Sequence, residues 1–260
     1  MPSEESPHQD GGSSLDNLFD RDYLRFYAAE LNDDTNDDEA QIIADILHLE
    51  DGIRILDLPC GHGRIARRLQ AMGARVTGID RCELFIQHAR EDAAQHNASV
   101  NYQVGDMHDL TCEGQFDVVI NWFTSFGYGD DASLRKILSH MHRALVPGGR
   151  LLLETLNLYE RNLQPTESSH TKELVDDEGR HFLIDRSYYD PHDGRIHARR
   201  SIANDGQPTR TINYELRLFT LIELTSWMHE AGFSSVQAFG ADGEVFRVDS
   251  TRMILVAQRN

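Results

Sequence analysis

The feature that most constrains the fold is the stretch ILDLPCGHGRIARRLQAMGARVTGID, which ends at Asp80. A short apolar run leads into a turn that contains Gly61 and Gly63, then into a helical period, and then into a second apolar run that ends in an acid. Glycines after a buried strand allow a tight turn, and the first turn of the next helix offers free amide donors to a ligand. This order predicts a strand, a ligand-binding turn, a helix and a second parallel strand.

The same alternation continues along most of the chain. Helical periods (ELFIQHAREDAAQH and LRKILSHMHRAL) alternate with short apolar runs (VNYQV, FDVVI and RLLLET), and SVQAFG and RMILVAQR close the sequence. Strands that alternate with helices are typical of an α/β fold, in which helices cover both faces of a mostly parallel, doubly wound sheet. We therefore expect one such domain over residues 35–180 and 219–260.

Two further segments depart from this alternation. Residues 181–218 hold three β-rich runs separated by the turn sequences PHDG and NDGQ, which predict a three-stranded antiparallel flap inserted after the fifth strand. Residues 15–34 carry apolar side chains at helical spacing and predict an N-terminal lid helix. Residues 1–14 are polar and rich in Gly, Ser and Pro, and we expect them to form a disordered tail.

The overall charge limits the partners. The formal net charge of -18 repels phosphate backbones and anionic lipid, so we expect no nucleic-acid partner and no membrane partner. The three cysteines (Cys60, Cys82 and Cys112) are too few and too scattered for a disulfide framework or a zinc site, and we predict no metal. No N-terminal apolar region resembles a signal peptide, so we expect a cytoplasmic protein.

The glycine turn by itself leaves the cofactor open. Asp80 follows Gly61 by nineteen residues, where its carboxylate would accept hydrogen bonds from ribose hydroxyls, and Gly61, Gly63 and Ala66 also satisfy the dinucleotide pattern G-x-G-x-x-A. Asp57 at the end of the first strand suits a cationic amino group and would repel the pyrophosphate of a nicotinamide cofactor. A nicotinamide-dependent oxidoreductase is therefore the alternative prediction.

Several motifs in order resemble the class I, Rossmann-like S-adenosylmethionine-dependent methyltransferases, over roughly residues 40–260. LDLPCGHG looks like the first motif of that class, VTGID the second, VGDMHDL the adenine-side loop, and LVPGGRLLLET the segment through the fifth strand. The resemblance implies a seven-stranded, mostly parallel sheet with an antiparallel last strand. It also implies S-adenosylmethionine as cofactor and S-adenosylhomocysteine as product.

The resemblance also assigns cofactor contacts. The methionine end would lie against Asp57, Cys60, Gly61 and Gly63, the ribose against Asp80 and Arg81, and the adenine against Asp106 and Met107. The cofactor set also includes Asn121, and Tyr23 and Tyr27 on the lid helix near the sulfonium.

The loop NWFTSFGYGDD is similar to the acceptor loop of small-molecule N-methyltransferases of the amino-sugar and glycine type. On that match Ser125 and Tyr128, together with Tyr27, are candidate catalytic residues. The candidate substrate contacts are Trp122, Phe123, Ser125, Tyr128, Asn157 and Arg217. Plain packing is an equal alternative for Trp122 and Phe123.

The predicted function is methyl transfer to nitrogen or oxygen of a small molecule by direct displacement, with secondary metabolism as the favoured context. The expected partner is a small-molecule methyl acceptor, and the chain would act as a monomer or homodimer. A catalytically silent cofactor-binding protein is the third hypothesis, beside the oxidoreductase.

Overall fold

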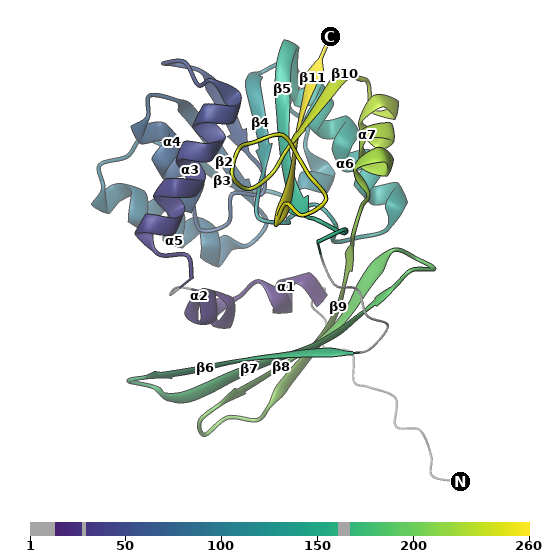
Figure 1. Ribbon diagram of the computed structural model, residues 1–260. Helices are drawn as coiled ribbons and strands as arrows, with labels where there is room; N and C mark the ends of the chain where they lie inside the picture. Colours follow the sequence, from purple (N-terminus) through teal and green to yellow (C-terminus); the bar gives the residue numbers. More distant parts are fainter. Residues whose placement is uncertain (1–13, 28–29, 161–166) are drawn as a thin grey trace.

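The computed structural model describes residues 14–27, 30–160 and 167–260, so the expected tail lies almost wholly outside the described residues. A seven-stranded sheet in the order β3-β2-β1-β4-β5-β11-β10 forms the main body (Figure 1). Its strands are β1 Arg54–Asp57, β2 Arg75–Asp80, β3 Asn101–Val104, β4 Phe116–Asn121, β5 Leu145–Leu156, β10 Phe233–Phe239 and β11 Arg252–Arg259.

The strand pairing confirms the predicted α/β architecture. β1 to β5 pair in parallel, and β11 runs antiparallel to both β5 and β10. All five parallel strands therefore end at one edge of the sheet, where ligands of such folds bind. In Figure 1 this is the lower edge, which faces the N-terminal helices and the flap.

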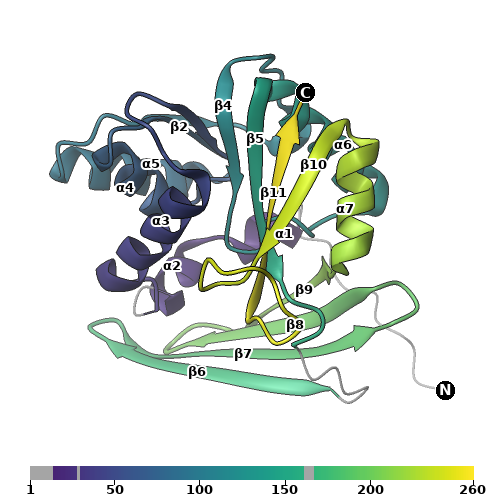
Figure 2. The same cartoon turned by 45° about the horizontal axis from the view of Figure 1, so that its top comes forward.

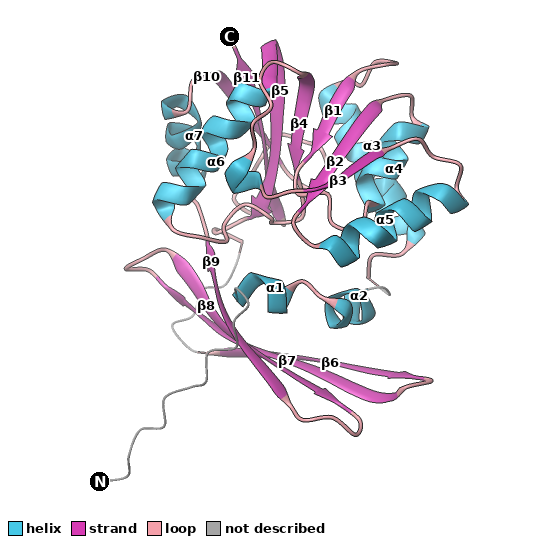
Figure 3. Cartoon of the chain, turned by 180° about the vertical axis from the view of Figure 1, so that it is seen from behind, coloured by secondary structure: helices cyan, strands magenta, loops and turns pink. Residues whose placement is uncertain are grey.

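Helices cover both faces of the sheet (Figure 3). They are α3 Asp33–Leu47, α4 Arg64–Ala71 and α5 Glu83–Gln95 on one face, and α6 Asp131–Ala144 and α7 Leu221–Glu230 on the other. Neighbouring strand residues point to opposite faces, so Ile55 packs in the core with α3 and α4, while Leu56 packs in the core with α6 and α7. This explains why the parallel strands read as continuous apolar runs.

The flap is a separate antiparallel sheet in the order β6-β7-β8-β9, and it lies beneath the main body (Figure 2). Its strands are β6 Ser168–Asp176, β7 Gly179–Asp190, β8 Arg195–Asn204 and β9 Arg210–Arg217. The prediction of three strands within residues 181–218 was therefore wrong by one strand. β6 is an edge strand with mostly exposed side chains, so it lacks the apolar alternation by which its neighbours were recognised.

The N-terminal segment forms two short helices, α1 Ser14–Leu18 and α2 Arg21–Tyr27, where we expected one. The side chain of Asp20 accepts the backbone N–H groups of Asp22 and Tyr23 and so begins α2 anew. Both helices lie between the main sheet and the flap (Figure 1). Phe26 packs in an apolar cluster of the flap, and Arg210 of β9 pairs with Asp20 at 2.5 Å, so these helices are anchored to the flap.

Among the described residues, no helix has both the length and the apolar character needed to cross a bilayer.

Candidate functional site

A cavity of about 760 Å³ lies at the carboxyl ends of β1 to β4. Loops that follow these strands form its floor, α1 and α2 form one wall, and side chains from all four flap strands form its roof. This is the size and position expected of a small-molecule site in a doubly wound fold.

Asp57 is the buried end of β1 and lines the cavity floor, with 2% of its surface exposed. Its Oδ2 atom has no hydrogen-bond partner among the described residues. Burial raises the pKa of Asp57 to about 7, an effect that Arg64 opposes and Asp80 reinforces. A buried carboxylate oxygen without a donor is a ready acceptor for a cationic ligand group.

The glycine turn after β1 has the conformation that the sequence predicted. Gly61 lines the cavity, and its backbone N–H donates to Oδ2 of Asp80 at 2.9 Å. Gly63 is the N-cap of α4 with a φ of 83°, and a Cβ there would lie 2.4 Å from the hydroxyl oxygen of Tyr102. Gly63 therefore allows the tight turn into α4 but is not one of the residues that line the cavity. Burial holds the pKa of the Cys60 thiol well above its usual range, so Cys60 lines the cavity as a neutral thiol.

Asp80 ends β2 and lines the cavity beside the glycine turn. Its Oδ1 atom accepts the backbone N–H of Cys82 at 2.8 Å, and its Oδ2 atom accepts that of Gly61. Burial raises the pKa of Asp80 although these two bonds oppose the shift. The carboxylate is thus held rigidly at the strand end, where each oxygen retains a further lone pair.

Asp106 and Met107, the residues predicted for the adenine, follow β3 and line the next part of the cavity. Asp106 accepts the backbone N–H of His108 at 2.9 Å and lies 2.6 Å from the His108 ring nitrogen Nδ1. Burial raises the pKa of Asp106, but the bonds from His108 outweigh it and the net shift is downward. Arg81 also lines the cavity, 3.7 Å from the Asp106 carboxylate.

Tyrosines form an aromatic wall above this floor. The rings of Tyr23 and Tyr27 stack with centroids 4.6 Å apart, and Tyr128 contacts Phe19 edge to face at 5.4 Å and Tyr214 at 6.4 Å. Burial raises the pKa values of Tyr23 and Tyr128, so both stay neutral phenols at physiological pH. This weighs against an anionic role for Tyr128.

The loop after β4 supplies a further part of the floor. Trp122 lines the cavity and donates its indole N–H to Glu39 at 2.7 Å, and Ser125 lines it and donates its hydroxyl to the Trp122 carbonyl at 2.8 Å. Asn121 is buried behind this surface, because its side-chain amide donates to the carbonyl of Leu58 across to the β1 loop. Asn121 therefore braces two loops and does not line the cavity.

Phe123 and Thr124 in this loop have an unusual backbone, with φ values of 60° and 57°. The left-handed region is sparsely populated by such residues, and persists where surrounding contacts hold it. The fully buried carboxylate of Glu154 accepts the Thr124 N–H at 2.8 Å and lies 3.1 Å from the Arg252 guanidinium. Both loop residues line the cavity.

Two predicted substrate residues lie outside the cavity lining. Asn157 is buried, and its side-chain amide donates to the carbonyls of Val248 at 3.0 Å and Ser250 at 2.6 Å. Arg217 ion-pairs with Glu223 at the start of α7. We expected Asn157 in the pocket because it follows β5, and Arg217 because its neighbours are apolar. In the structure, the polar groups of both side chains instead hold the chain in place where it enters and leaves the flap.

Sequence reasoning missed several lining residues. Arg64, Arg252, Asp185 and Arg200 all line the cavity. Arg200 is bound through two hydrogen bonds to Asp185, at 2.8 and 2.7 Å, and donates to the Tyr27 hydroxyl at 3.2 Å. Arg64 follows the glycine motif directly, which is a signal that could have been used. Arg252 is the first residue of β11, and no pattern in the sequence marks it as a cavity residue.

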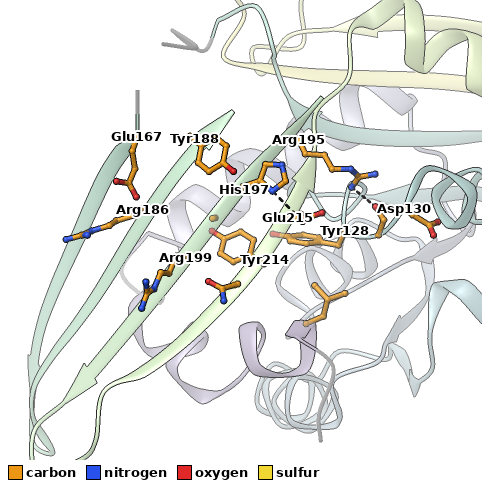
Figure 4. Close-up of a pocket in the computed structure, with 14 residues that line it drawn as sticks. Tyr128, Asp130, Glu167, Arg186, Tyr188, Arg195, His197, Arg199, Tyr214 and Glu215 are labelled. Atoms are coloured by element: carbon orange, nitrogen blue, oxygen red, sulfur yellow. Dashed lines mark hydrogen bonds and ion pairs between the residues drawn. The ribbon is translucent and has the colours of Figure 1, made fainter. Parts of the chain in front are cut away.

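A second hollow of about 630 Å³ adjoins the first on the flap (Figure 4). Leu15, Tyr128 and Tyr214 line both hollows, and in the second the rings of Tyr188 and His197 stack with centroids 5.2 Å apart. The main cavity and the second hollow therefore meet at Tyr128 and Tyr214.

Among the residues that the structure describes, one group has the ligand spacing of a metal site, namely Asp190, Asp193 and His197. The His197 ring nitrogen Nε2 lies within hydrogen-bond distance of the Asp193 carboxylate, at 2.8 Å, on the flap and outside the main cavity.

Comparison with known proteins finds similarity to methyltransferases, in sequence over part of the chain and in fold over most of it. The model of the methyltransferase domain family matches residues 55–149, which run from β1 to β5. Ubiquinone biosynthesis O-methyltransferases of Xanthomonas oryzae are 33% identical over 108 residues, and those of Coxiella burnetii 31% identical over 106 residues. Both alignments cover 41% of this chain and 44% of the relative, so the chain spans under half the length of these relatives.

Solved structures resemble nearly the whole chain. The CcbJ methyltransferase from Streptomyces caelestis has a TM-score of 0.71 at 23% identity and covers 86% of this chain and 95% of its own. CalS10, an amino pentose methyltransferase from Micromonospora echinaspora solved with bound S-adenosylmethionine, has a TM-score of 0.67 at 23% identity and covers 94% and 99%. The sugar N-methyltransferase KedS8 from Streptoalloteichus has a TM-score of 0.66 at 17% identity and covers 100% and 98%. The chain thus has the fold of these methyltransferases, flap included.

Proposed function

We propose that this chain, whose residues 55–149 match the methyltransferase domain family, is a class I enzyme that transfers a methyl group from S-adenosylmethionine to a small molecule. The observation that carries the proposal is the row of acids Asp57, Asp80 and Asp106, which follows the strand order β1, β2, β3 along the floor of one cavity. S-adenosylmethionine presents an ammonium, a ribose and an adenine in that order.

The residues present fit this cofactor. The unpaired Oδ2 atom of Asp57 suits the ammonium, and the rigidly held carboxylate of Asp80 suits two ribose hydroxyls. Asp106 and Met107 would hold the adenine, with Arg81 beside them. A dinucleotide would bring its pyrophosphate to the glycine turn next to Asp57, where like charges repel. The acid at this position disfavours the oxidoreductase.

The cofactor supplies an electrophilic methyl group on a sulfonium. The chain contributes alignment and exclusion of water, since holding two reactants in line supplies roughly 7 to 11 kcal/mol of the barrier. The stacked rings of Tyr23 and Tyr27 would lie over the methionine end, where aromatic faces attract a cation by about 0.5 to 2 kcal/mol. Ser125 and Tyr128 would contact the acceptor from the β4 loop.

We further propose an amine as the acceptor. An amine that enters the aromatic cavity loses solvation, which lowers its pKa and favours the neutral, nucleophilic form. Burial also lowers the pKa of His62 on the cavity floor to about 4, so this ring stays neutral and is too weak a base to remove a proton from the acceptor, whereas a neutral amine needs no base before it attacks the methyl group. CalS10 is an amino pentose methyltransferase and KedS8 a sugar N-methyltransferase, and both activities support the same choice.

The acceptor would enter from the flap side. The second hollow adjoins the cavity at Tyr128 and Tyr214, and this shared border is the proposed entrance for the acceptor.

The test combines cofactor binding with turnover. Asp80→Ala should weaken binding of S-adenosylhomocysteine by about 10- to 100-fold, because it removes a charged acceptor of two hydroxyl donors. Asp117→Ala, which removes a half-exposed acid paired with Arg54 at the opposite end of β1, is the matched control and should bind normally. Transfer of labelled methyl to a panel of amino sugars and phenols then separates the hypotheses. Turnover of phenols alone would refute the amine, and cofactor binding without any turnover would favour the silent protein.

A further inference from the structure

Three buried donor atoms around Phe123 have no hydrogen-bond partner within the described part of the chain. They are Nη2 of Arg64, Oγ1 of Thr124 and Nη1 of Arg252. All three residues line the main cavity. A buried donor left unpaired costs about 1 to 3 kcal/mol, and more when it is charged. Three such donors on one cavity wall point to a ligand that carries an acceptor.

The Phe123 ring fixes both guanidinium groups. The central carbon of Arg64 lies 4.7 Å from the ring centroid and that of Arg252 lies 5.0 Å from it. Glu39 pairs with Nη1 of Arg64 at 2.6 Å, and Glu154 pairs with Nε of Arg252 at 3.1 Å. A guanidinium has five N–H donors, so each group keeps donors free after it has bound its glutamate.

The backbone brings the third donor to the same place. Phe123 and Thr124 adopt left-handed conformations, and Glu154 holds them by accepting the Thr124 N–H. Strained backbone of this kind is concentrated at ligand sites, where surrounding contacts offset its cost. One buried glutamate therefore both holds the turn and orients Arg252.

We propose that Arg64, Thr124 and Arg252 form a carboxylate-binding subsite, and that its ligand is the carboxylate on the amino-acid end of the cofactor. This inference rests on the proposed function. Planar guanidinium groups match the geometry of a carboxylate, which makes arginine the preferred partner for that group.

The position of Arg64 decides between the cofactor and the acceptor as the source of the carboxylate. Arg64 begins α4 directly after the glycine turn, and its charge acts on Asp57 at the end of β1. An α-ammonium and an α-carboxylate are joined through a single carbon, so their partners must be close neighbours. The unpaired acceptor on Asp57 and the unpaired donor on Arg64 meet this condition, because the Arg64 charge acts on Asp57 and both residues line the same cavity. The adjacent strands β1 and β4 bring the Thr124 loop to the same end of the sheet.

The experiment compares two ligands by titration calorimetry. S-adenosylhomocysteine carries the amino-acid end, whereas 5′-methylthioadenosine keeps the adenine, ribose and sulfur but lacks it. Arg252→Met keeps an unbranched apolar chain against Phe123 and removes the donors. We expect Arg252→Met and Arg64→Met each to weaken S-adenosylhomocysteine about 10- to 100-fold and to leave 5′-methylthioadenosine within about twofold. Arg54→Met, on the exposed start of β1, is the control and should change neither affinity.

A second measurement needs no variant, so a variant that fails to fold does not leave the proposal untested. The wild-type chain should bind S-adenosyl-3-thiopropylamine, which differs from S-adenosylhomocysteine by the missing carboxylate, at least about tenfold more weakly. Equal affinity for these two ligands would overturn the subsite, as would equal losses for both ligands in Arg252→Met. Failure of the wild-type chain to bind any of the three ligands would instead refute the proposed function.

Discussion

Replacement of Asp57 by Asn should stabilise the protein and impair cofactor binding. Burial raises the pKa of this carboxyl from its ordinary 3.8 to about 7. A raised pKa means that the folded state favours the protonated form, so the contribution of Asp57 to stability is full below about pH 4 and is lost as pH rises to about 7. Above that window the chain carries an ionised, unpaired oxygen on Asp57 in its core.

The magnitude follows from the shift. Each pKa unit corresponds to about 1.4 kcal/mol, so a shift of roughly three units corresponds to about 4 kcal/mol at pH 8. Asn stays neutral but needs partners for its amide, which reduces the gain to about 2 kcal/mol. In a chain of this size that gain raises Tm by roughly 5 °C at pH 8, and the difference should shrink towards pH 5.

Cofactor affinity should change in the opposite direction. With a pKa near 7, about a tenth of wild-type Asp57 is ionised at pH 6 and about nine tenths at pH 8, so affinity for S-adenosylhomocysteine should rise about tenfold over this range. Asp57→Asn should bind weakly and without this pH dependence. Thermal unfolding and calorimetry at pH 6 and 8 test both claims. A variant that is less stable at pH 8, or that keeps the wild-type pH dependence, would refute the reasoning.

Three other substitutions probe the turn, the lid and the buried glutamate. Gly63→Ala should cost about 2 to 4 kcal/mol in denaturant unfolding, because its Cβ would lie 2.4 Å from the Tyr102 hydroxyl and φ is positive; wild-type stability would contradict this. Arg210→Ala removes the ion pair with Asp20 and should speed cofactor dissociation severalfold in stopped flow, an effect absent if the N-terminal helices are not a lid. Glu154→Ala should lower the free energy of unfolding by about 3 kcal/mol, because it leaves the buried Arg252 charge without its partner. Glu154→Gln should lose less stability, because glutamine still accepts the Thr124 N–H, and equal losses would argue against this hydrogen bond.

The fold was predictable wherever buried positions require apolar residues at a regular spacing in the sequence. Continuous apolar runs such as FDVVI mark strands covered on both faces, and the turn sequences PHDG and NDGQ mark the hairpins β7–β8 and β8–β9. β6 was missed because an exposed edge strand needs no apolar residues. The N-terminal helix was predicted as one because helical spacing continues through Asp20, whose side chain begins a new helix.

The site was predictable where a residue belongs to a local motif. Asp57, Gly61 and Asp80 lie on one strand-turn-helix-strand unit, so their sequence spacing fixes their spatial relation. Arg252 and Arg200 reach the cavity from distant segments, and only the folded chain brings them to Phe123 and Tyr27. Asn157 directly follows β5, as expected of a site residue. The direction of its side chain, however, is set by its hydrogen bond to Ser250 in the loop before β11.

Thermal unfolding of the wild-type chain with S-adenosylhomocysteine and, separately, with NADH tests the central claim most directly. A ligand at 100 times its dissociation constant adds about 2.7 kcal/mol to stability, which is a rise in Tm of roughly 5 to 10 °C for a chain of this length. The account predicts this rise with S-adenosylhomocysteine and none with NADH. A rise with NADH alone would contradict it and assign the glycine turn to a nicotinamide cofactor.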